Sequence, residues 1–177
     1  MLEFRDFSFI QKYFTGEKNE SLLFLLIGMT ALLAAVVFFF FIKTNPSFYK
    51  GMAIPLFIIA LIQLTVGYTV YARTDKQVAD IAYKIGMEPV QYTKSTELPR
   101  MQTVKKNFTI YRWIEIALLL AGLVLIFLYR SDVSKTFLVG IGIALAIQAA
   151  IMLAADYFAE QRGKTYQQKL EKILSEK

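Results

Sequence analysis

Four long apolar segments, each bounded by charged residues, dominate the pattern of hydrophobic and polar positions. The segments 21–42, 51–72, 116–129 and 136–155 contain no Asp, Glu, Lys or Arg. Because an α-helix rises about 1.5 Å per residue, about 20 residues cross the roughly 30 Å hydrocarbon layer of a bilayer. The pattern therefore predicts an all-α, polytopic membrane protein with four transmembrane helices.

The third segment is the least obvious span, because its uncharged part has only 14 residues. Extending it back to residue 110 makes 20 residues but includes Arg112 and Glu115. Both lie in the first turns, where an arginine reaches the headgroups and an acid finds a partner. The first segment ends in bulky side chains and not in a small-residue cleavage site, so we expect it to be retained. The expected spans are about 21–42, 51–72, 110–129 and 136–155.

The N-terminal residues 1–16 form a candidate amphipathic helix. Its apolar face consists of Phe4, Phe7, Ile10 and Phe14, and Gly16 is in position to end it. A helix of this kind lies in the bilayer interface or, in a sharper interpretation, binds a partner protein.

Further apolar stripes at helical spacing predict helices that continue beyond the spans, and Pro99 is placed to start the helix that becomes the third span. The stripes are Val78, Ile81, Ala82 and Ile85 after the second span, Met101, Val104 and Phe108 before the third, and Tyr166, Leu170, Ile173 and Leu174 after the fourth. Only 87–98 looks irregular. We expect these extensions and the N-terminal helix to pack into a small cap.

A gapless offset of 87 residues aligns the first half of the chain with the second. It pairs 32–35 with 119–122 and Lys43 with Arg130. This match suggests an internal duplication in which residues 17–177 form two similar helical hairpins packed as a four-helix bundle.

The net charge of +6 is distributed unevenly along the chain. Of the 20 Lys and Arg residues, 16 lie in the N-terminal stretch, in 73–112 or in the tail, and 4 lie in the two short connections. The positive-inside rule therefore predicts a multi-pass protein of the inner (plasma) membrane with both termini, the 73–109 connection and the 156–177 tail in the cytoplasm. This rule and the attraction to anionic lipid account for the charge without nucleic-acid binding.

The composition removes several kinds of chemistry. The chain has no Cys and no His, which excludes disulfides, thiolate or His metal centres and His-ligated haem. We also find no Gly-rich phosphate loop, no nucleophile–base set and no paired carboxylates in one pocket-forming segment. We therefore expect no enzyme activity, no catalytic or metal-binding residue and no cofactor.

Three residues form a candidate polar site near the middle of the spans, namely Gln63, Thr65 and Gln148. A buried amide needs a hydrogen-bond partner. Either the glutamines bond two helices together, or they line a site for a neutral ligand.

Arg112, Glu115 and Asp156 form a candidate charge cluster at the edge of the membrane. Arg112 and Glu115 share a helix face, and Asp156 closes the fourth span at the same depth. The cluster either ties the third span to the fourth or makes Glu115 a site for a proton or cation.

The fourth span also carries candidate helix-packing residues in overlapping small-xxx-small pairs. They are Gly140, Gly142, Ala144 and Ala146. They serve either packing within the bundle or a dimer interface.

These observations favour a non-enzymatic integral membrane protein that acts by protein–protein binding in the membrane, as an accessory or assembly subunit or as a toxin-neutralising immunity-type protein. Its partners would be the lipid bilayer and another membrane protein or a second copy of itself. The alternative is a small oligomeric transporter or channel for an ion or small solute.

Overall fold

The structure is a computed structural model that describes residues 8–175. It is all-helical, and the described residues form no strand. The order of elements is α1 (Ser8–Phe40), α2 (Pro46–Met87), α3 (Pro89–Tyr92), a π-helical turn (Thr93–Glu97), α4 (Leu98–Tyr129), a 3₁₀ turn (Val133–Lys135) and α5 (Thr136–Ser175).

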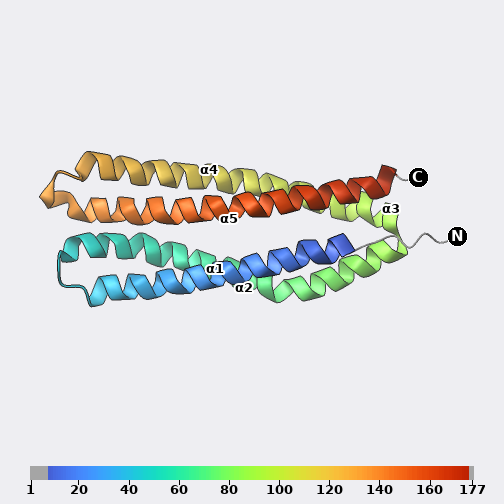
Figure 1. Cartoon of the computed structure of the whole chain (residues 1–177), viewed down its shortest axis with the longest axis horizontal. Coiled ribbons are helices and arrows are strands. Elements are labelled where there is room, and N and C mark those ends of the chain that lie inside the picture. The colour runs from blue at the N-terminus through green and yellow to red at the C-terminus, as the bar shows by residue number, and fades with distance from the viewer. Residues whose placement is uncertain (1–7, 176–177) are drawn as a thin grey trace.

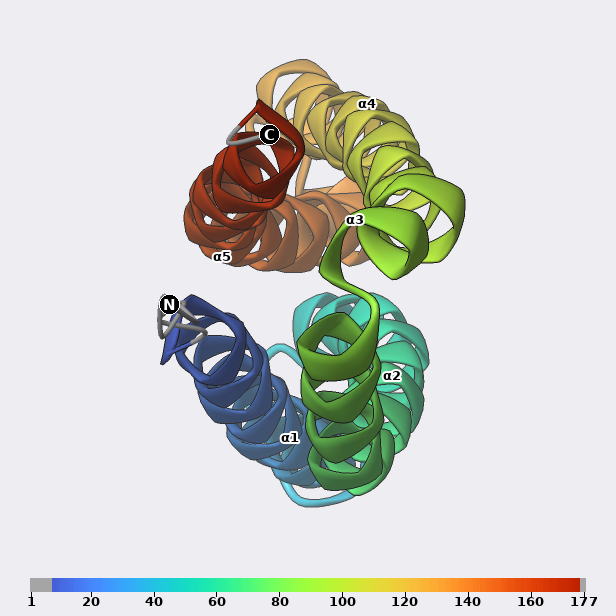
Figure 2. The same ribbon diagram turned by 90° about the vertical axis from the view of Figure 1, so that its right-hand side faces the viewer.

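The four long helices lie side by side along one common axis, and the chain reverses direction between α1 and α2 and between α4 and α5 (Figure 1). The short connections after α1 and after α4 lie together at one end of the molecule, which we call the turn end. The opposite end, which we call the charged end, contains the start of α1, the end of α2, α3, the start of α4 and the end of α5. Viewed along the long axis in Figure 2, α1 pairs with α2 and α4 pairs with α5.

All four long helices are long and apolar enough to cross a membrane. The expected second, third and fourth spans lie inside α2, α4 and α5, and α1 covers the first span as far as Phe40, two residues short of its expected end. These helices contain 33, 42, 32 and 40 residues. At about 1.5 Å per residue each is close to 50 Å or longer, well beyond a roughly 30 Å hydrocarbon layer. The helices therefore continue past the apolar layer, as the stripes on the second, third and fourth spans predicted.

The expected helix end at Gly16 is wrong, because α1 runs from Ser8 through Gly16 to Phe40 without interruption. A Cβ atom at Gly16 would lie 2.5 Å from Cδ of Arg162 on α5. The glycine therefore lets an arginine side chain cross α1 at close range. Its role is packing between helices, which no local pattern in the sequence reveals.

The expected irregular stretch 87–98 is also helical for most of its length. Only Glu88, with φ −134° and ψ 67°, separates α2 from α3. Pro89 occupies the first position of α3, where the missing N–H of proline is not needed. The π-helical turn Thr93–Glu97 then leads directly into α4.

We call the part of the molecule built from the uncharged segments 21–42, 51–72, 116–129 and 136–155 the apolar half. There, glycines let helix backbones touch. A Cβ at Gly51 would lie 2.1 Å from the Phe137 carbonyl oxygen, and a Cβ at Gly140 would lie 2.1 Å from that of Phe48. No larger residue fits at this crossing of α2 and α5 without a shift of the backbone. The buried apolar cluster in this half is made almost wholly of alanines: Ala31, Ala35, Ala53, Leu56, Ala60 and Ala144.

A second glycine crossing joins α4 to α5. A Cβ at Gly122 would lie 2.6 Å from the Gly142 carbonyl oxygen, and the converse distance is also 2.6 Å. Helix α5 therefore packs closely on α2 through one face and on α4 through another. This central position of α5 brings the candidate site residues of two different helices together.

Candidate functional site

A cavity of about 140 Å³ lies between α4 and α5, where the apolar half meets the charged end. Its lining comprises Phe108, Arg112, Glu115, Leu153, Asp156, Tyr157 and Glu160. All three residues of the expected charge cluster line this cavity. Sequence reasoning missed Glu160, although it lies four residues after Asp156 and so shares its helix face.

Glu160 forms ion pairs with two basic residues near the cavity. The Arg112 guanidinium donates to its carboxylate across the α4–α5 contact. Lys164, one turn further along α5, pairs with the same carboxylate at 3.1 Å between Nζ and Oε1. Arg112 therefore pairs with Glu160, a residue that the predicted three-residue cluster did not include.

Glu115 is the buried carboxyl of this cavity. Its side chain is only 2% exposed, and its Oε2 atom has no hydrogen-bond partner. It lies within hydrogen-bonding range of the Asp156 carboxyl on α5. This part of the cavity therefore holds two adjacent carboxyls and one acceptor without a donor.

The two glutamines of the expected midplane site bond directly to each other. Gln63 Nε2 donates to Gln148 Oε1 at 3.3 Å, and the side chains are 2% and 3% exposed. Thr65 is not part of this contact, because it is exposed and its hydroxyl donates to the Leu61 carbonyl one turn back on the same helix. Positions two apart on a helix differ by about 200° around its axis, so Thr65 faces away from Gln63. The structure therefore does not bring Thr65 together with the two glutamines.

The small residues of the fourth span are occupied within the chain. Gly140, Gly142 and Ala144 are buried. A Cβ at Gly122 of α4 would lie 2.9 Å from the backbone nitrogen of Ala146. These contacts fit packing within the chain, whereas Ala150 and Ala154 further along α5 are exposed.

A cluster of large apolar side chains fills the charged end. Its buried members come from α1, α2, α4 and α5 and are Ile10, Tyr13, Phe14, Ile81, Ile85, Met101, Tyr166, Leu170 and Ile173. Tyr13 and Tyr166 stack with ring centroids 4.2 Å apart. The expected packing of the helix extensions against the N-terminal helix is therefore present in the structure.

This packing changes the interpretation of the N-terminal face. Ile10 and Phe14 are 0% and 1% exposed, so they are not available to a lipid surface or to a partner protein. Phe4 and Phe7 lie outside the described residues. The described part of the predicted face, Ile10 and Phe14, is occupied by the chain itself because three other helices also extend beyond the apolar layer.

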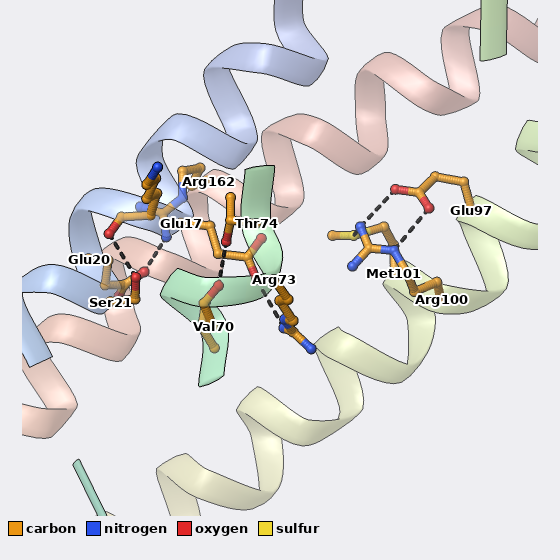
Figure 3. A network of polar contacts seen from close by, with 11 residues as sticks. Glu17, Glu20, Ser21, Val70, Arg73, Thr74, Glu97, Arg100, Met101 and Arg162 are labelled. Atoms are coloured by element: carbon orange, nitrogen blue, oxygen red, sulfur yellow. Dashed lines mark hydrogen bonds and ion pairs between the residues drawn. The ribbon is translucent and has the colours of Figure 1, made fainter. Parts of the chain in front are cut away.

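Glu97 anchors the polar part of this end, and sequence reasoning did not single it out. It is 0% exposed and accepts two hydrogen bonds from Arg100, at 2.9 and 2.7 Å (Figure 3). The Tyr166 hydroxyl on α5 donates to the same carboxylate at 2.8 Å. Burial and the Glu97 charge raise the pKa of the Tyr166 phenol, so the hydroxyl stays a donor throughout the physiological range.

Ion pairs between helices lie just inside this cluster, towards the apolar half. Arg162 of α5 pairs with Glu20 of α1, and Arg73 of α2 pairs with Glu17 of α1 at 3.3 Å (Figure 3). Lys18 adds a contact to Asp75 at 2.6 Å. These pairs connect α1 to both of its neighbours at the end of the apolar segments.

Comparisons with protein-family models, with curated proteins and with solved structures find no match to this chain. Among residues 8–175, no group of three or more His, Cys, Asp or Glu side chains is arranged to hold a metal ion.

Proposed function

We propose that this chain is a non-enzymatic integral membrane protein that acts by binding another membrane protein, as an accessory or assembly subunit or as an immunity-type protein. The observation that carries the proposal is the uneven use of the helix surfaces. Of its 32 residues, α4 buries only Met101, Glu115 and Gly122, whereas α2 and α5 bury eleven residues each. Helix α4 therefore offers most of its circumference to its surroundings.

The outward surface of α4 is long, apolar and aromatic. It presents Ile110, Tyr111, Trp113, Ile114, Leu120, Leu123, Val124, Phe127 and Leu128. A helix of a partner protein can pack along such a surface in place of lipid. Since the closest packing sites of α5 are used inside the chain, α4 is the surface that we assign to the partner.

The proposed placement in the membrane follows the positive-inside rule. The two pairs α1–α2 and α4–α5 form hairpins of one bundle in a bacterial-type inner membrane, derived from an internal duplication. The charged end, with both termini, faces the cytoplasm, and the turn end faces the opposite side. Outer connections as short as 41–45 and 130–135 leave little for recognition there, which favours recognition within the membrane.

The test is affinity purification of the tagged chain from its native membranes, with identification of the proteins that stay bound. The informative variant is Val124→Trp, which adds bulk to the outward face of α4. The matched control is Leu33→Trp on the outward face of α1, where Leu33 is similarly exposed. We expect a stoichiometric partner with the unchanged chain and with the control, and its loss with Val124→Trp.

Retention of the partner by both variants would move the binding surface away from α4. A homo-oligomer that only Val124→Trp dissociates would identify the partner as a second copy of the chain. A monomeric chain with no bound protein would contradict the proposal as a whole.

A small oligomeric transporter or channel for an ion or small solute is the second candidate, favoured by the buried Glu115 carboxyl and its unpartnered oxygen. The direct contact between Gln63 and Gln148 argues against a water-filled path at the midplane. In proteoliposomes, transport predicts a flux that Glu115→Gln abolishes. Absence of any flux from the correctly folded protein would exclude this function.

A further inference from the structure

We propose that the cavity between α4 and α5 binds a primary ammonium group, held between the carboxylates of Glu115 and Asp156. This site is independent of the partner-binding surface on the outward face of α4. The proposal rests on the unpartnered acceptor, the distribution of charge, the size and lining of the cavity, and its depth in the molecule.

The first observation is the acceptor itself. Glu115 is 2% exposed and lines the cavity, yet its Oε2 atom accepts no hydrogen bond. A buried acceptor left without a donor is costly, and a charged one more so. An ammonium group carries three N–H donors on one positive centre, so it can satisfy Glu115 and the neighbouring Asp156 together.

The charges around the cavity leave room for one cation. Arg112 and Lys164 both pair with Glu160, so two basic groups face three carboxyls at the cavity. Arg162, two residues before Lys164 on α5, pairs with Glu20 of α1. Among the described residues neither Glu115 nor Asp156 forms an ion pair of its own, and a cation bound to both removes their mutual repulsion.

The shape and lining favour an organic cation over a metal ion. A volume of about 140 Å³ is several times the roughly 30 Å³ that one water occupies, so a group of several heavy atoms fits. Phe108 and Tyr157 line the same cavity, and aromatic faces attract ammonium groups. The carboxylates are not arranged to hold a metal ion in the part of the chain that the structure describes.

The depth of the cavity points to a source for the ammonium group. Tyr157 of the cavity lining is 58% exposed, and Tyr111 and Trp113, which flank Arg112 on α4, are exposed as well. Exposed Tyr and Trp beside an arginine are typical of the level of the lipid headgroups. A primary ammonium at this level belongs either to the ethanolamine headgroup of a phospholipid or to a free amine that enters from the aqueous side.

The experiment measures which probes the purified protein retains. In one arm, the protein in detergent is offered phosphatidylethanolamine, phosphatidylcholine or phosphatidylglycerol at equal concentration, and bound lipid is counted by native mass spectrometry. We expect phosphatidylethanolamine to bind about tenfold or more tightly than phosphatidylcholine, whose quaternary nitrogen has no N–H donor. In the other arm, free ethanolamine is titrated calorimetrically.

The variants connect binding to the two carboxyls. Glu115→Gln keeps the size of the side chain and removes its charge, and we expect it to lose about tenfold or more in affinity for the ammonium probe. Asp156→Asn is the second test, for use if Glu115→Gln does not fold. Glu171→Gln is the matched control, because Glu171 is exposed and lies away from the cavity.

Binding of phosphatidylethanolamine alone, sensitive to the cavity variants, would assign the site to a lipid headgroup. Binding of free ethanolamine with the same sensitivity would assign it to a soluble amine. The proposal is overturned if neither probe binds, if phosphatidylcholine binds as well as phosphatidylethanolamine, or if the cavity variants and the control behave alike.

Discussion

The charged end and the apolar half are parts of the same four long helices, but they bury opposite kinds of side chain. At the charged end the buried residues are large, and three of them, Tyr13, Phe14 and Tyr166, are aromatic. In the apolar half the buried cluster holds five alanines and Leu56, with glycines at the closest crossings. Large apolar residues are abundant in that half, but they point outward.

The difference follows from the surroundings of each part. In water, burying a large apolar side chain contributes about 1.5–3 kcal/mol, so such residues collect inside. In lipid there is no such gain, since acyl chains are as apolar as leucine, and helices associate through close backbone packing instead. With the chain placed in the membrane as we propose, the change from one kind of core to the other marks the membrane surface, and the interhelical pairs Glu20–Arg162 and Lys18–Asp75 lie at that boundary.

The largest expected effect comes from removing an aromatic anchor at the charged end. Phe14 is 1% exposed, meets Tyr13 edge-on at 5.0 Å and has Arg100 over its ring at 5.6 Å. We expect Phe14→Ala to destabilise this end by about 3–5 kcal/mol. Hydrogen exchange in nanodiscs should show lost protection at the start of α1 and the end of α5.

The same measurement tests whether the charged end and the apolar half unfold separately. If the two parts are separate in their energetics, the apolar half keeps its protection in Phe14→Ala. Phe127→Ala, which removes an outward-facing ring near the turn end, is the control and should change stability by less than about 0.5 kcal/mol. Simultaneous loss of protection along whole helices would show that the two cores unfold as one unit.

The next effect in size tests the glycine crossing of the apolar half. Gly140→Ala places a Cβ about where the Phe48 carbonyl oxygen lies, 2.1 Å away, so α2 and α5 must separate. We expect a loss of about 2–3 kcal/mol, measured by SDS titration of the folded protein. Gly86→Ala is the matched control, because its Cβ would meet nothing within 4 Å and alanine favours the helix by up to about 1 kcal/mol. Equal effects of the two substitutions would contradict backbone contact as the basis of this half.

A smaller effect tests the buried polar contact at the charged end. Tyr166→Phe removes the hydroxyl that donates to Glu97 at 2.8 Å but keeps the ring stacked on Tyr13. Because Arg100 still satisfies Glu97, we expect a loss of only about 1.5 kcal/mol. Tyr83→Phe, at an exposed tyrosine of α2, is the control. A loss as large as that from Phe14→Ala would mean that Glu97 depends on Tyr166 for its burial.

The sequence predicts the local features of this molecule better than the contacts between its helices. Hydropathy locates the four apolar helices, and the spacing of Ile81, Ile85 and Leu170 predicts which extension residues turn inward. The packing role of Gly16 is not predictable, because it depends on Arg162 from a distant part of the chain. The burial of Glu97 is hidden for the same reason, since Arg100 is near it in the sequence but Tyr166 is 69 residues away.

The outward direction of Thr65 and the place of Glu160 beside Asp156 were accessible from helical geometry alone. A separation of two residues puts Thr65 on the opposite side of the helix from Gln63, and a separation of four puts Glu160 on the face of Asp156. Which faces meet across two helices still requires the structure. The predicted cluster therefore contains three of the seven residues that line the candidate cavity, and the sequence does not show that they share one space.

The smallest expected effect concerns the one side-chain hydrogen bond that the structure places between spans at the middle of the described apolar half. Gln63 and Gln148 are nearly inaccessible and bond at 3.3 Å. Hydrogen bonds between membrane helices contribute about 0.6 kcal/mol on average, because each group also finds partners in the unfolded state. In a double-mutant cycle of Gln63→Leu and Gln148→Leu, followed by SDS titration, we expect a coupling near that value. Thr65→Val combined with Gln148→Leu supplies the control and should show no coupling, since the Thr65 hydroxyl bonds only to its own helix. A coupling above about 2 kcal/mol would mean that the amides belong to a larger polar network, and the apolar half would then depend on polar contacts as the charged end does.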